Sequence, residues 1–240
     1  MSFAQQRILI IGGSNGMGLA AARSLARDGA EVLIAGRSQA KLDLALATIE
    51  GRAAGYVADF TDPASLTALF ERIGRIDHLV LAGSSNAAWG PFASVPASAL
   101  RAAIEGKLVG YWQSLQAALP HLRRDGSVVM LSGAASRTAM PGTAGLAAVN
   151  GALTQMAQTL AKELAPLRVN VVSPGLVDTP AYDGMPAEAK AGMFAGAAKS
   201  LPAGRTGTPE DIAAAIVYLL GNGFTTGAIL DVDGGARMSV

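Results

Sequence analysis

The sequence predicts one α/β domain built around a doubly wound, mostly parallel sheet. Short apolar runs alternate with longer helical patterns along the 240 residues, which is the order expected when helices cover the strands of such a sheet. Most of the runs are continuously apolar rather than alternating, as in strands that are buried on both faces. We therefore expect helices on both sides of a single sheet.

Seven apolar runs are expected to form strands, and two helices are marked by their ends. The strands are expected at Ile8–Ile11, Glu31–Ala35, Gly55–Ala58, His78–Ala82, Ser127–Leu131, Val169–Val172 and Ile229–Val232. A helix is expected over Met17–Arg27, because Asp28 and Gly29 provide a favourable C-terminal end. Another is expected over Pro63–Ile73, because proline is favoured in the first turn.

A third helix and a possible lid complete the expected order. Apolar residues recur at three-to-four spacing from Leu146 to Leu164, which predicts a helix with one buried face. The segment Thr179–Thr208 is rich in Ala, Gly, Met and Pro and is expected to be an insertion or lid rather than a core element. Because no linker or repeat divides the chain, we expect a single domain over residues 1–240 with a lid at about residues 179–208.

Composition excludes several classes of function. A net charge of +1, from 19 basic and 18 acidic residues, gives no sign of binding to nucleic acid or to a membrane surface. The absence of cysteine excludes disulfides and thiolate metal sites, and no His/Asp/Glu cluster has metal-ligand spacing. No apolar run reaches the roughly 18 residues of a membrane span, and the first residues lack signal-peptide anatomy. We therefore expect a soluble, cytoplasmic protein without a metal.

The turn after the first strand is the strongest functional signal. Gly12, Gly16 and Gly18 give the spacing GxxxGxG between a strand and a helix. Glycines let the backbone approach a pyrophosphate, and the helix N-terminus presents free N–H groups to it. The alternative is a tight strand–helix connection without a ligand. The turn residues expected to contact a dinucleotide are Gly12, Ser14, Asn15, Gly16, Met17 and Gly18.

Several further segments, in the right order, resemble the short-chain dehydrogenase/reductase family over nearly the full chain. They are GGSNGMG at the glycine turn, VADFTD, LVLAGS, RVNVVSPGLVDT, TPEDIA and TGAILDVDGG. The resemblance implies a Rossmann-type fold and a nicotinamide cofactor, with Asp59 against the adenine and the region of Val177 and Thr179 against the carboxamide. It implies further cofactor contacts at Phe60, Ala82, Gly83, Pro174 and Gly175.

The end of the second strand favours one nicotinamide cofactor. A carboxylate at this point would bind the ribose 2′-OH of NAD, but Gly36 stands there instead. Arg37, Ser38 and Lys41 follow, and a cation at a helix N-terminus makes more sense when an anion shares the site. The pattern predicts NADP(H) in preference to NAD(H). The alternative is that Arg37 is an ordinary solvated arginine.

The residues expected to perform chemistry depart from the family's pattern. The family's Tyr-x-x-x-Lys motif falls on Leu146 and Asn150, and its serine falls on Gly133, beside Ser132. The family's helix asparagine falls on Lys107. Losing a positioned acid–base group costs an enzyme roughly 10²–10⁴ in rate. Catalysis would therefore need a replacement group.

Lys107 is the leading replacement, with Ser132 and Asn150 as further candidates. An ammonium in an apolar cleft could stabilise an oxyanion, or donate a proton if burial lowers its pKa. The alternative is a solvated or structural lysine, paired with Glu105. Ser132 should point away from the site unless a bulge re-aims it, and Asn150 could bond a ribose hydroxyl. Tyr111 is a candidate acid in principle, but aromatic packing against Trp112 is the favoured interpretation.

Three functions remain open from the sequence. The first is an NADPH-dependent oxidoreductase that reduces a carbonyl substrate, with activated or vicinal dicarbonyls favoured because they need less acid assistance. The second is a catalytically weak sensor or regulatory pseudoenzyme that binds NADP(H). The third is an interaction subunit that the nucleotide only stabilises. The resemblance also implies a homo-oligomer, a dimer or tetramer, formed through the helices around Ala97–His121 and Leu146–Leu164.

Overall fold

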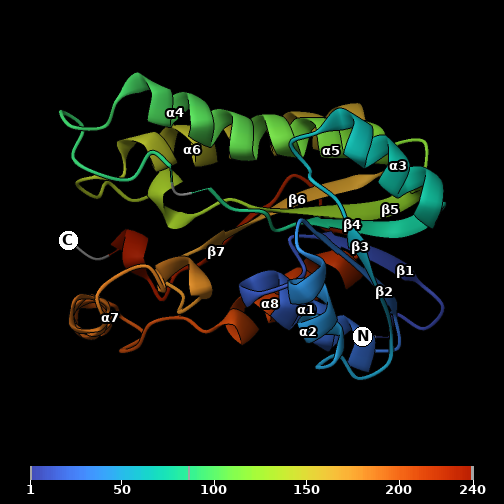
Figure 1. Cartoon of the computed structure of the whole chain (residues 1–240), viewed down its shortest axis with the longest axis horizontal. Coiled ribbons are helices and arrows are strands. Elements are labelled where there is room, and N and C mark those ends of the chain that lie inside the picture. Colours follow the sequence, from blue (N-terminus) through green and yellow to red (C-terminus); the bar gives the residue numbers. More distant parts are fainter. Residues whose placement is uncertain (1, 86, 239–240) are drawn as a thin grey trace.

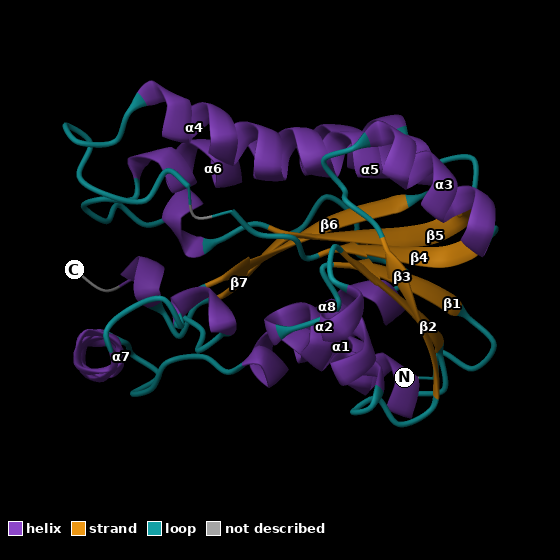
Figure 2. Cartoon of the chain, in the orientation of Figure 1, coloured by secondary structure: helices purple, strands orange, loops and turns teal. Residues whose placement is uncertain are grey.

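The structure, a computed structural model, describes residues 2–85 and 87–238 and contains one seven-stranded parallel sheet. The strand order is β3-β2-β1-β4-β5-β6-β7. Helices cover both faces (Figures 1 and 2), which confirms the predicted fold class. The strands are β1 (Arg7–Ile11), β2 (Glu31–Gly36), β3 (Arg52–Val57), β4 (Ile76–Leu81), β5 (Leu122–Leu131), β6 (Arg168–Pro174) and β7 (Ile229–Val232).

The helices form two layers, each with its own apolar core. One layer holds α1 (Gly16–Arg27), α2 (Gln39–Leu46) and α8 (Pro209–Gly221). The other holds α3 (Pro63–Ile73), α4 (Ala97–Ala103), α5 (Gly110–Ala118) and α6 (Ala144–Glu163). The central strands are therefore buried from both sides, which is why their sequences are continuously apolar.

The strand order reverses direction at β1, where the nucleotide is expected. The chain leaves β1 toward β2 on one side, and β4 pairs with β1 on the other. In open α/β sheets, ligands bind at such a switch point, beyond the carboxyl ends of the strands. The glycine turn and the end of β4 meet at this point, since the Ala82 N–H donates to the Ile11 carbonyl at 2.8 Å.

Some strand limits differ from the expected ones, and the reasons are physical. β3 begins at Arg52 rather than Gly55, because it pairs with β2 from Glu31 onward. It is the edge strand and is half-exposed, so its apolar pattern is weak. β5 begins at Leu122, five residues before the apolar run. Backbone pairing extends these strands into sequence that hydrophobic patterning does not mark.

The segment expected as a lid contains regular structure. It holds the short 3₁₀ turn η3 (Pro180–Tyr182) and the helix α7 (Ala187–Ser200). No residue of α7 is fully buried, and Figure 1 shows the helix at one end of the molecule, away from the sheet. Its many small residues permit a helix without giving it a clear apolar face, so composition alone did not predict one.

Within residues 2–85 and 87–238, no helix is long and apolar enough to span a bilayer.

Candidate functional site

The glycine turn forms a tight cradle at the end of β1. Gly12 and Gly16 adopt positive φ angles of 86° and 50°, which glycine tolerates without strain. A Cβ on Gly12 would lie 2.7 Å from the carbonyl carbon of Ala82, and one on Gly18 would overlap the Gly12 carbonyl oxygen. Asn15, which precedes α1, makes no side-chain capping bond. The first N–H groups of α1 are therefore free to bind a phosphate.

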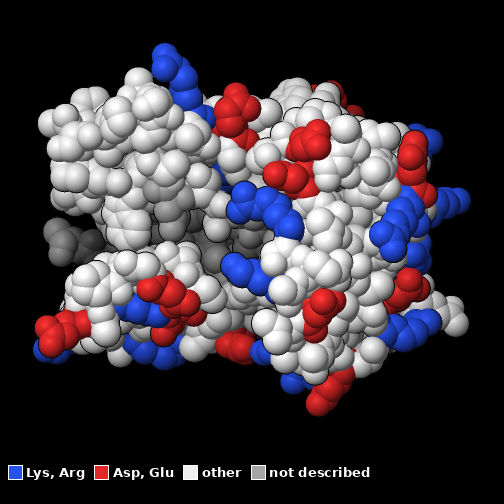
Figure 3. Space-filling view, in the orientation of Figure 1, with Lys and Arg blue, Asp and Glu red and all other residues white. Residues whose placement is uncertain are grey.

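Several residues that are predicted to contact the adenosine part of the cofactor lie beside this cradle. A Cβ on Gly36 would lie 3.2 Å from the Ser14 hydroxyl oxygen, so the turn and the end of β2 are in contact. Arg37 is exposed and lies near enough to Asp59 to help lower the pKa of that carboxyl group. Ser38 caps α2, since its hydroxyl accepts the Lys41 N–H at 3.4 Å. Figure 3 shows Lys and Arg side chains beside a hollow on this face.

Asp59 and Phe60 take different positions. The Asp59 carboxylate accepts bonds from the Thr61 hydroxyl at 2.7 Å and the Thr61 N–H at 2.9 Å, which are the main causes of its lowered pKa. The lowered pKa keeps the Asp59 carboxylate negatively charged just after the end of β3. The Phe60 ring instead packs against the backbone of Gly83 and Gly110. Its side chain fills the helical layer rather than the cradle.

The end of β6 brings the last predicted contacts to the glycine turn. The Gly175 N–H donates to the Val232 carbonyl at 2.9 Å, and a Cβ there would lie 2.6 Å from the Cα of Asp233. Val177 is buried. A Cβ on Gly16 would lie 3.5 Å from the methyl group of Thr179. Thr179 therefore stands over the turn, while Pro174 ends β6.

Lys107 is buried and points at Asn150. It lies in a π-helical segment, Ile104–Val109, between α4 and α5, and such segments are frequent at functional sites. Its ammonium donates to Asn150 Oδ1 at 2.8 Å and to the Ser132 carbonyl at 3.0 Å. Among the described residues nothing accepts its third N–H. Burial lowers the pKa of Lys107 to about 8. The interpretation of Lys107 as a solvated lysine is therefore wrong, and a structural lysine stays the alternative.

Ser132 meets Lys107 through its backbone rather than its hydroxyl. Its N–H still pairs with the Val172 carbonyl, so β-type pairing continues to this residue. Its hydroxyl oxygen accepts the Gly133 N–H at 2.5 Å. A Cβ on Gly133 would lie 2.8 Å from Asn150 Nδ2. The missing side chain at Gly133 thus leaves the space that the Asn150 amide uses to reach Lys107.

Tyr111 has a different environment from the expected one. Its hydroxyl donates to the Gly83 carbonyl at 2.7 Å, and its ring lies 6.3 Å from the Phe60 ring. Trp112, by contrast, is half-exposed. Tyr111 is fully buried and its pKa is raised by that burial. Its hydroxyl therefore links α5 to the loop after β4, and its raised pKa does not favour a role as an acid.

Sequence reasoning missed one ion-pair cluster near the ends of β5 and β7. Asp231 pairs with Arg137 at 3.0 Å and with Arg237 at 3.1 Å. Arg137 is far from Asp231 in the sequence, and the segment TGAILDVDGG that contains Asp231 does not indicate an ion pair with either arginine. Their pairing fixes the segment after Gly133 against the end of the sheet.

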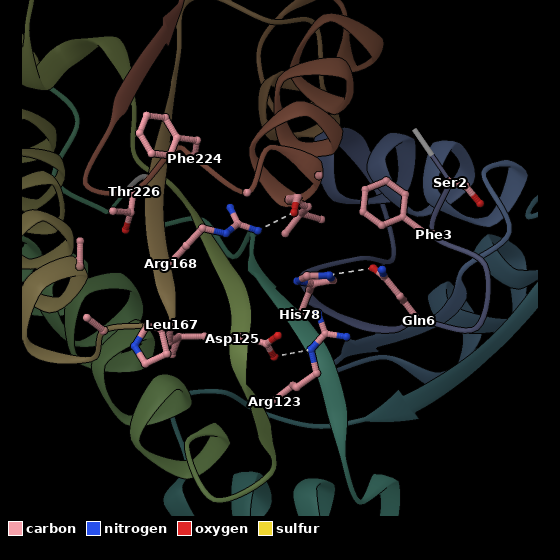
Figure 4. Close-up of a pocket in the computed structure, with 16 residues that line it drawn as sticks. Ser2, Phe3, Gln6, His78, Arg123, Asp125, Leu167, Arg168, Phe224 and Thr226 are labelled. Atoms are coloured by element: carbon pink, nitrogen blue, oxygen red, sulfur yellow. Dashed lines mark hydrogen bonds and ion pairs between the residues drawn. The ribbon is translucent and has the colours of Figure 1, made fainter.

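A cavity of about 800 Å³ lies at the amino ends of the central strands, opposite the glycine turn (Figure 4). Its charged residues serve the fold: Arg168 donates to the Leu219 and Leu220 carbonyls at the end of α8, and Arg123 pairs with Asp77 at 2.9 Å. Burial lowers the pKa of His78 to about 4. We assign no ligand to this cavity. The described residues also hold no group of three His, Asp or Glu side chains suited to a metal.

Comparison with known proteins gives the family. A family model described as enoyl-(acyl carrier protein) reductase matches residues 12–237. The short-chain dehydrogenase/reductase ATR9 of Stachybotrys chlorohalonatus is 34% identical, over 96% of this chain and 96% of that protein. The chain belongs to the short-chain dehydrogenase/reductase family. The 3-oxoacyl-[acyl-carrier-protein] reductase FabG of Thermotoga maritima is 32% identical, over 95% of this chain and 96% of that protein.

Solved structures agree with this assignment. A small-chain dehydrogenase in complex with NADPH superposes with a TM-score of 0.86 and 32% identity, covering 98% of this chain and 100% of that one. This short-chain dehydrogenase/reductase is thus an oxidoreductase of a family that uses a nicotinamide cofactor. The tight glycine cradle, with free N–H groups at α1, fits the pyrophosphate of such a cofactor.

Proposed function

We propose that this protein is an NADP(H)-dependent oxidoreductase that reduces a carbonyl substrate, with Lys107 in place of the family's tyrosine. One observation carries the proposal. A buried ammonium is held by Asn150 and the Ser132 carbonyl, and its third N–H has no partner among the described residues. An ammonium has three donors, so one is left to meet a substrate oxygen.

The position of this pair supports a role in the reaction. In the family alignment an asparagine is expected at Lys107 and a lysine at Asn150. The two residue types have exchanged helices, and their side chains still touch at 2.8 Å. Leu146, at the tyrosine position, lies one turn before Asn150 on α6 and brings no proton. Among the described residues, Lys107 therefore supplies the one buried cation of the expected active site.

In this proposal Lys107 stabilises one negative charge and supplies one proton. Bound NADPH supplies a hydride to the carbonyl carbon, and negative charge then develops on the carbonyl oxygen. The Lys107 ammonium stabilises that charge and transfers a proton to the oxygen, leaving a neutral amine and an alcohol. Asn150 keeps the ammonium oriented. An activated carbonyl, such as a vicinal diketone, needs less acid assistance and is the expected substrate type.

The proposal is tested by NADPH consumption with purified protein over a panel of ketones, aldehydes and dicarbonyls. We expect saturable turnover that is fastest with the dicarbonyls. Saturable NADPH binding without turnover of any compound in the panel would favour the alternative function, a sensor or regulatory pseudoenzyme. The leucine at the family's tyrosine position also supports that alternative.

The preference for NADP(H) makes a separate prediction. Replacing Arg37 by alanine should raise the Kd for NADPH about tenfold and leave the Kd for NADH unchanged, because a hydrogen bond to a charged group contributes about 1.5 kcal/mol. Fluorescence titration with both cofactors measures this. Arg52→Ala is the matched control, since Arg52 is also exposed but begins the edge strand. Equal weakening of both cofactors would refute a contact with the 2′-phosphate.

We also infer a homo-oligomer, a dimer or tetramer. Trp112 and Leu119 are 52% and 38% exposed on and just after α5, and a second copy would cover them.

A further inference from the structure

Three aromatic rings from separate segments form one contact series. Trp89 comes from the loop after β4, Tyr182 from η3 and Phe194 from α7. The Trp89 and Tyr182 ring centroids lie 5.9 Å apart, and those of Tyr182 and Phe194 lie 5.4 Å apart, both in edge-to-face geometry. Edge-to-face pairs are favourable ring contacts. We call these three residues the aromatic cluster.

The cluster connects the two halves of the proposed active site. On one side, Ala88 precedes Trp89 and packs in the same buried group as Val149, which precedes Asn150. On the other side, a Cβ on Gly16 would lie 3.5 Å from Thr179 and 3.8 Å from Pro180, at the start of η3. The cluster therefore spans from the side of the Lys107–Asn150 pair to the glycine turn.

The rings are incompletely packed by the protein itself. Trp89 is 42% exposed, Tyr182 and Phe194 are half-buried, and α7 has no fully buried residue. Ion pairs also hold the segment that carries Tyr182 and Phe194, because Lys190 pairs with Asp178 at 2.9 Å and with Asp183 at 3.2 Å. Figure 3 shows the surface hollowed between α7 and the opposite helical layer. The exposed parts of the three rings offer apolar area that a ligand would bury.

We propose that the aromatic cluster is the specificity wall of the substrate site and selects carbonyl compounds with an aromatic or bulky alicyclic group. The inference rests on the proposed function. A ring-sized apolar group gains about as much as a buried Phe or Leu side chain, which corresponds to a preference of about ten- to hundredfold over a methyl group. Small hydrophilic carbonyls gain nothing from this wall.

Two diketones that share the reactive group test the inference. We expect wild-type kcat/KM for 1-phenyl-1,2-propanedione to exceed that for 2,3-butanedione by at least about tenfold. Phe194→Ala and Trp89→Ala should each raise KM for the phenyl diketone and reduce this ratio severalfold. Phe224→Ala, a fully exposed phenylalanine on the loop before β7, is the matched control. An unchanged ratio in both cluster variants overturns the inference.

A binding measurement separates failure of the wall from failure of the chemistry. The chain has two tryptophans, so Trp112→Phe leaves Trp89 as the single reporter. With NADP⁺ bound, 2-phenyl-2-propanol, a tertiary alcohol that cannot be oxidised, should change Trp89 fluorescence saturably, whereas tert-butanol should not. Adding Phe194→Ala should remove the response. Binding without turnover of any diketone would retain the wall and refute the reductase. No response to the phenyl alcohol would refute the wall.

Discussion

Replacing Lys107 by methionine is expected to lower kcat for carbonyl reduction by about 10²–10⁴, the usual contribution of a positioned acid–base group. Methionine retains the apolar stem and approximate volume but removes all three donors. The Kd for NADPH should change little, because the expected pyrophosphate cradle lies at Gly12–Gly18 and is built without Lys107. Steady-state kinetics and an NADPH fluorescence titration on the same preparation measure the two quantities.

The control for this substitution is Lys162→Met, on the exposed surface of α6, which should leave kcat unchanged. Lys107→Met should be less stable than the wild type by about 1–3 kcal/mol, because Asn150 Oδ1 and the Ser132 carbonyl lose their buried donor. Thermal unfolding of the same preparation shows whether the variant is folded. A folded Lys107→Met protein with wild-type kcat would remove Lys107 from the mechanism.

The same residue gives the pH dependence a definite sign. Burial lowers the pKa of Lys107 from 10.5 to about 8. Reduction needs the protonated ammonium, so kcat for reduction should fall as pH rises through about 8. Oxidation of the alcohol needs the neutral amine as base, so kcat for oxidation should rise over the same interval. A pH–rate profile in both directions checks this, and Lys107→Met should abolish both transitions.

The sequence predicted the sheet well because its signals are local. Apolar runs located all seven strands, and the starts of β5 and β3 were the least accurate, because these strands extend into polar or half-exposed sequence. The conformation of the glycine turn was also predictable, since a glycine adopts positive φ without strain. Both depend on residues adjacent in the chain.

The chemistry of the site was less predictable because it depends on distant contacts. Lys107 was identified, but its orientation depends on a π-helical segment and on space left by Gly133, neither of which has a sequence signature. Ser132 contributes its carbonyl because its hydroxyl bonds the next N–H. The position of the Phe60 ring could not be predicted from VADFTD, because it depends on glycines of two other segments, Gly83 and Gly110.

Replacing Gly18 by alanine is expected to raise the Kd for NADPH about 100-fold. The added Cβ would overlap the Gly12 carbonyl oxygen, which is backbone and cannot move without opening the turn. Opening the turn withdraws N–H groups from the pyrophosphate, and losing two hydrogen bonds to a charged group, at about 1.5 kcal/mol each, corresponds to that factor. Overpacking should also destabilise the fold by about 1–3 kcal/mol. Fluorescence titration and thermal unfolding measure the two effects.

Gly151→Ala is the matched control, because it makes the same substitution in a helix where nothing lies within 4 Å of the added Cβ. There alanine should stabilise the protein by about 0.5–1 kcal/mol and leave the Kd for NADPH unchanged. The contrast separates the general effect of alanine in a helix from the close contact at Gly12. If Gly18→Ala bound NADPH within about threefold of the wild type, the N–H groups of this turn would not hold the pyrophosphate, and the phosphate site would have to lie elsewhere along the carboxyl ends of the strands.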